Sequence, residues 1–151
     1  RAGVPFGELD PTDYGVPGSF GLIYTNREFL DAHPTAAEDF VRATLKGLAD
    51  ALADPDAAAQ ASFDLVEASG NPSFLSLEGE TFRWNTDARI ITETTPPDTF
   101  PGVPVVAEFE EQIAAYDAAG MYPAGAPSIE GRYSLLAADV YADDGTVIWP
   151  G

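Results

Sequence analysis

Asp13 and Tyr14, which stand directly before Gly15, are the residues best suited to hold a small ligand. A tyrosine ring can stack on a planar molecule while its hydroxyl forms a hydrogen bond, and an aspartate carboxylate accepts hydrogen bonds. Surface turns also favour aspartate, so the pair has two interpretations: a turn alone, or a turn that contacts a ligand. Gly15 would serve such a site through the freedom of its backbone.

An apolar run from Phe20 to Tyr24 follows this turn and is rich in strand-forming residues. Alternate residues of a strand share a face, so Phe20 and Tyr24 would lie on one side. The arginines that a nitrate or sulfonate site needs are scattered along the chain, whereas these aromatic residues cluster. The cluster therefore favours a planar or heterocyclic ligand over a small inorganic anion.

The sequence offers few residues for a metal site or a catalytic site. His33 is the only histidine and the chain has no cysteine, which leaves little basis for a metal site, a catalytic triad or a thiol nucleophile. Because His33 stands just before Pro34, we expect it to act as a helix cap or linker. No stretch matches a phosphate loop, a dinucleotide fingerprint or a calcium loop. We therefore expect no catalytic residues, no metal and no cofactor, and interpret the protein as a non-enzyme.

The composition limits the class of partner. The 151 residues include 25 acids and 7 bases, a net charge of −18, which argues against nucleic acid or an anionic membrane surface as partner. An apolar content of 45% is typical of a folded protein. No stretch approaches the roughly 18 to 20 apolar residues that cross a bilayer. The first residue is Arg1, so we expect a processed or truncated chain.

The strongest predicted element is a helix from about Thr35 to Ala53. Thr35 and Glu38 have the spacing of a capping box at its start. Four apolar side chains recur at helical intervals and are expected to form its buried face: Val41, Leu45, Leu48 and Leu52. This helix is therefore predicted to be a core element.

Further helices are predicted on both sides of a proline-rich connection. They cover a turn capped by Asn26, a helix after Asp54, and residues of about 77–91, 105–119 and 134–140. The connection, residues 94–104, holds four prolines and should be irregular. Trp84 and Trp149 are expected to be core or surface anchors. The early strand has no obvious partner strand, which suggests that half of the protein is missing.

Three segments carry a resemblance to known proteins: Asp13 to Pro17, Thr25 to Leu30 and Phe40 to Pro55. They resemble the carboxy-terminal part of substrate-binding proteins of ABC importers, in the group that includes thiamine-pyrimidine-precursor, nitrate, sulfonate and taurine binders. Glu110 to Gly120 and Asp143 to Gly151 look similar to the last helices and tail of that family. The resemblance thus extends over nearly the whole chain.

The resemblance implies an α/β fold: a partial lobe of the type II periplasmic-binding-protein fold, mostly helical, with a hinge strand near the start. Residues 1–26 would be the hinge and lip, and residues 27–151 would complete one lobe of a two-lobe protein about twice this length. The glycines and Pro17 would permit closure, while Asp13 and Tyr14 face the cleft. The implied ligand-binding residues are Asp13, Tyr14, Gly15 and Phe20.

The function implied is that of an extracytoplasmic solute-binding protein, either periplasmic or anchored to the cell surface. It would deliver a small molecule, pyrimidine-like or sulfonate-like, to an ABC permease, and its ligand site would need the missing amino-terminal half. One alternative is a pyrimidine-synthase-like enzyme of the same fold. The resemblance implies that this enzyme branch depends on histidine and a cysteine-rich motif. Another alternative is a helical protein-interaction domain without a small ligand.

Overall fold

In a computed structural model the chain divides into two units. The first unit comprises Arg1–Thr25 with Pro104–Ser134, and the second comprises Asn26–Val103 with Leu135–Gly151. The structure describes residues 5, 7, 9–16, 21–70, 76–131 and 136–149.

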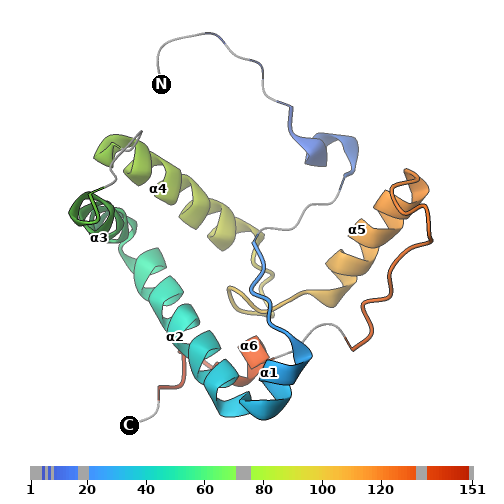
Figure 1. Cartoon of the computed structure of the whole chain (residues 1–151). Helices are drawn as coiled ribbons and strands as arrows, with labels where there is room; N and C mark the ends of the chain where they lie inside the picture. The colour runs from blue at the N-terminus through green and yellow to red at the C-terminus, as the bar shows by residue number, and fades with distance from the viewer. Residues whose placement is uncertain are drawn as a thin grey trace. The chain divides into compact units, whose positions relative to one another are not determined.

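Helices make up most of the regular structure, as the sequence predicts (Figure 1). The first unit holds the short 3-10 helix η1 (Pro11–Tyr14) and helix α5 (Val106–Ala118). The second unit holds α1 (Arg27–Ala32), α2 (Pro34–Ala53), α3 (Pro55–Ala68), α4 (Leu77–Thr94) and α6 (Leu136–Asp139). Each predicted helix is found, and α4 extends beyond its predicted end.

Side-chain caps fix where three of these helices begin. The Asn26 carboxamide oxygen accepts a hydrogen bond from the Phe29 N–H at 2.7 Å, and Asp54 accepts one from the Ala57 N–H at 3.0 Å. Both caps are confirmed as predicted. Ser76, which the sequence reading missed, caps α4 by accepting from a backbone N–H at 3.1 Å.

The predicted capping box of Thr35 and Glu38 is wrong. Helix α2 begins one residue earlier, at Pro34, and its cap residue His33 makes no side-chain hydrogen bond to the helix. Proline suits the first helical position because its φ angle is already helical and its missing N–H would have no partner there. His33 also ends α1 and joins it to α2, which agrees with its predicted role as a helix cap or linker.

The strand predicted from Phe20 to Tyr24 is not confirmed. Residues 21–26 have no regular secondary structure, and Phe20 lies outside the described residues. A strand satisfies its backbone groups only by pairing with another strand. The β pairing in the described residues is an isolated antiparallel bridge between Tyr141 and Val147, so the α/β part of the predicted fold is not confirmed either.

Only one of the four predicted core positions of α2 is fully buried. Leu45 is 5% exposed, whereas Val41, Leu48 and Leu52 are half-buried, which corrects the prediction of a uniformly buried face. The physical reason is the size of the covering elements, because α2 contacts the short helices α1 and α6 along with α3. Short helices cover only part of the apolar stripe.

Helices α3 and α4 pack against each other (Figure 1). Ala59 on α3 and Ala88 on α4 are both buried. The half-buried Trp84 donates its indole N–H to the Ala51 carbonyl at 3.2 Å, which ties α4 to the end of α2. Trp84 is thus the anchor that the sequence predicts, whereas Trp149 is exposed.

The end of the second unit folds back on the proline-rich connection. Val140 is completely buried, and the adjacent Tyr141 donates its hydroxyl to the Pro101 carbonyl at 2.8 Å. The Tyr141 ring also lies 4.8 Å, centroid to centroid, from the ring of Phe100. These contacts connect two segments that are far apart in the sequence.

Tyr141 should make stability sensitive to alkaline pH. Burial raises the pKa of its hydroxyl above the ordinary value. The folded state therefore holds this proton more tightly than the unfolded state does. The resulting contribution to the free energy of unfolding is fully present below about pH 10, and it is lost as the pH rises through the pKa of the folded state. We expect Tyr141→Phe to lower the free energy of unfolding by about 0.5 to 1.5 kcal/mol at pH 7, because its hydrogen bond is lost. When the pH is raised above 10, the variant should lose less stability than the parent chain does.

Urea denaturation of the parent chain and the variant at pH 7 and about pH 10.5 measures both effects. Tyr24→Phe is the matched control, because Tyr24 is 92% exposed. An alkaline loss of stability that is the same in both variants would show that Tyr141 does not cause it.

Candidate functional site

Asp13 and Tyr14 close the short helix η1 at the start of the first unit. The Asp13 N–H donates to the Asp10 carbonyl at 3.2 Å, and the Val16 N–H donates to the Pro11 carbonyl at 3.1 Å. Gly15, between them, has a φ of +69°, in the left-handed region that glycine adopts freely. The turn is therefore built around Gly15.

The side chains on this turn face solvent. Tyr14 is 70% exposed and Asp13 is exposed as well. Three large apolar side chains farther along the same unit, Leu22, Ile23 and Tyr24, are also exposed. This segment therefore leaves its large apolar side chains uncovered.

Three of the four predicted ligand-binding residues are thus brought together by η1 and its turn: Asp13, Tyr14 and Gly15. The fourth, Phe20, lies outside the described residues, as do Pro17 and Gly18 of the predicted hinge. The prediction that Phe20 shares a side with Tyr24 therefore stays a prediction.

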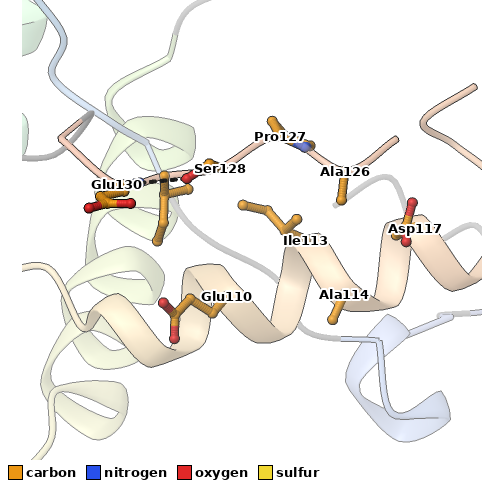
Figure 2. Close-up of a pocket in the computed structure, with 9 residues that line it drawn as sticks. Glu110, Ile113, Ala114, Asp117, Ala126, Pro127, Ser128 and Glu130 are labelled. Atoms are coloured by element: carbon orange, nitrogen blue, oxygen red, sulfur yellow. Dashed lines mark hydrogen bonds between the residues drawn. The ribbon is translucent and has the colours of Figure 1, made fainter. Parts of the chain in front are cut away.

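The first unit has a groove that the sequence analysis did not predict. It has a volume of about 590 Å³ and lies between α5 and the extended segment 126–130 (Figure 2). Glu110, Ile113 and Asp117 line it from α5, and the figure shows Ile113 and Asp117 directed toward the segment. These three residues recur at intervals of three and four, so the sequence alone could have placed them on one face of a helix.

The groove combines an apolar floor with acidic groups. Ile113 and Ile129 are half-buried within it, and Glu110, Asp117 and Glu130 add carboxylates. The Glu130 N–H donates to the Ser128 hydroxyl oxygen at 3.2 Å, which shapes the turn of the segment. None of the described residues that line it is basic.

Metal-binding groups do not gather anywhere in the described part of the chain. No set of three or more histidine, aspartate and glutamate residues there could hold a metal ion. The exposed ring of His33 instead lies 5.2 Å from the ring of Phe29 on the preceding helix. Within the same described residues, no helix has the length and apolar character needed to span a membrane.

The turn of Asp13 to Gly15 lies in the part of the chain that is similar to known proteins. Residues 1–58 match the family described as NMT1/THI5 like. The match includes the segments Thr25 to Leu30 and Phe40 to Pro55, and it ends early in α3. Neither a curated protein nor a solved structure matches the chain. The likeness is confined to the first 58 of the 151 residues.

Proposed function

We propose that this chain is part of the solute-binding component of an ABC importer, which holds a small molecule between two lobes. The observation that carries the proposal is the family match over residues 1–58, since it spans all four predicted ligand-binding residues: Asp13, Tyr14, Gly15 and Phe20. A family of periplasmic-binding type is consistent with binding and transport rather than with catalysis. The protein would act outside the cytoplasm and deliver its ligand to a permease.

In this proposal residues 1–26 form the hinge and lip, and residues 27–151 complete one lobe. The exposed ring of Tyr14 supports the lip, because one of its faces can stack on a ligand. Gly15, with its positive φ, allows the backbone to turn sharply beside it. An amino-terminal half of the same protein would supply the opposite wall, and ligand binding would then favour the closed arrangement of the lobes.

The ion pairs of three described arginines are one reason to propose a planar, pyrimidine-like ligand instead of a sulfonate. Arg42, Arg83 and Arg89 each form an ion pair with a carboxylate of their own helix. An anion site needs cationic groups that are directed at the anion, and these three are already occupied. Tyr14 and Tyr24, in contrast, present exposed aromatic rings. A heterocycle that stacks on such a ring is therefore the proposed ligand class.

Calorimetry on the full-length gene product with pyrimidine precursors, taurine, alkylsulfonates and nitrate tests this function. We expect Tyr14→Ala to weaken binding of a pyrimidine precursor about tenfold, since an aromatic stacking pair contributes up to about 1.5 kcal/mol. Trp149→Ala is the matched control: it removes an exposed aromatic side chain outside the family match and should leave affinity unchanged.

Four outcomes would contradict parts of the proposal. Failure of the full-length product to bind any of these ligands would exclude the solute-binding function, and turnover of a pyrimidine precursor would favour the enzyme alternative. Unchanged affinity in Tyr14→Ala would remove this residue from the site. Micromolar or tighter binding by residues 1–151 alone would contradict a site shared between two lobes, because half of the contacts should be missing.

A further inference from the structure

We propose that the peptide bond between Tyr24 and Thr25 is a cleavage site for a serine endoprotease with an apolar S1 pocket. This inference concerns the backbone of residues 21–25 and does not depend on the proposed transport function. Hydrolysis there would consume one water molecule and leave a carboxylate on Tyr24 and an amino group on Thr25. It would divide the chain into residues 1–24, which hold η1, and residues 25–151.

The backbone of residues 21–25 is available to a protease. An endoprotease binds its substrate as an extended strand whose N–H and C=O groups pair with the enzyme. Residues 21–25 have no regular secondary structure and are all exposed, and their backbone groups take part in no hydrogen bond within the described part of the chain. Asn26, the next residue, is also extended, with φ −85° and ψ 157°. A protease can therefore bind this segment without first unfolding it.

The side chain of Tyr24 supplies the specificity. It is 92% exposed, more than any other large apolar side chain among the described residues. Serine proteases of the chymotrypsin type select the residue before the cleaved bond through a hydrophobic pocket. An aromatic ring that already stands in solvent can enter such a pocket without leaving contacts in the fold.

Other exposed apolar residues are protected by their backbone. Phe40, Leu65 and Phe82 are all more than half exposed, yet they lie within α2, α3 and α4. A helical backbone reaches the extended form that a protease binds only after local unfolding. Met121 is 61% exposed, but its N–H donates to the Tyr116 carbonyl at 3.0 Å.

Three further exposed residues are less suitable because of the residues around them. Leu9 stands two residues before η1 and Tyr14 lies within it, so part of the backbone that a protease would extend is held in a helical turn. Trp149 is followed by Pro150, which lacks the N–H of an ordinary peptide bond and which serine proteases accept poorly after the cleaved bond. Tyr24 is thus the exposed aromatic residue whose backbone is open on both sides.

Limited digestion of the folded 151-residue chain with chymotrypsin, followed by mass spectrometry of the intact fragments, tests the proposal. We expect residues 1–24 and 25–151 to be the first products. Tyr24→Ser should slow this cut about tenfold or more, because the S1 pocket no longer buries an aromatic ring. Thr25→Pro should slow it at least as much with Tyr24 still in place. The Thr25 N–H makes no hydrogen bond in the described structure, so this proline removes none.

Phe40→Ser is the matched control, because it removes an exposed aromatic ring that lies in a helix. This variant and Tyr24→Phe should keep the rate of the first cut within about twofold of the parent chain. A first cut outside residues 21–25 would overturn the proposal, and so would an equal rate in Tyr24→Ser. Circular dichroism melts of each variant confirm that the fold is retained.

Leu45→Ala distinguishes cleavage of the folded chain from cleavage after unfolding. Leu45 is buried, so its truncation increases the population of unfolded chains. The cut after Tyr24 should stay within about twofold in this variant, because the segment is already open in the folded state. A rate that rises in proportion to the lost stability would overturn the proposal.

Discussion

Leu45→Ala is expected to lower the free energy of unfolding by about 2 to 5 kcal/mol. Leu45 is the one residue of the apolar stripe of α2 that is fully buried, at 5% exposure. Truncation removes apolar contacts and leaves a cavity that its surroundings fill only in part. Urea denaturation followed by circular dichroism measures the loss directly.

Leu48→Ala is the matched control, because it makes the same chemical change on the same helix at a half-buried position. We expect it to cost clearly less than Leu45→Ala, since less apolar surface returns to water. Asp50→Asn, which disturbs only the exposed ion pair with Lys46, should change stability by less than about 0.5 kcal/mol. Equal losses at positions 45 and 48 would mean that the face of α2 is uniformly buried after all.

The difference between these positions shows what the sequence could and could not predict about the fold. Helix boundaries depend on neighbouring residues, and the caps at Asn26 and Asp54 are read directly from them. Burial depends on which element covers each turn of a helix, and the spacing of leucines does not contain that information. The strand predicted at residues 20–24 is not confirmed for a similar reason, because a strand depends on partner strands elsewhere in the sequence.

The same distinction between local features and features that depend on packing applies to the candidate sites. The turn at Asp13 and Tyr14 was predictable because a glycine with positive φ and its neighbours form a local motif. The groove on α5 was not, because its second wall is segment 126–130, which has no periodic pattern. A site made by two segments appears only once their packing is known.

Gly102→Ala is expected to lower the free energy of unfolding by about 2 to 4 kcal/mol, through two separate effects. Gly102 has a φ of +83°, a conformation that costs a residue with a side chain about 1 to 2 kcal/mol. A Cβ atom there would also lie 2.5 Å from the Leu45 Cδ2 atom, far inside van der Waals contact. The side chain of Leu45 is buried, so moving it disturbs its neighbours.

Gly70→Ala separates the two effects, because Gly70 has a similar φ of +76° but no atom within 4 Å of the added carbon. It should show the backbone cost alone, about 1 to 2 kcal/mol. The double variant Leu45→Ala/Gly102→Ala should then be less destabilised than the sum of its single variants, since truncating Leu45 removes the atom that the new methyl group meets. Strict additivity in urea denaturation would contradict the close approach of Gly102 to Leu45, and with it the seating of the proline-rich connection against α2.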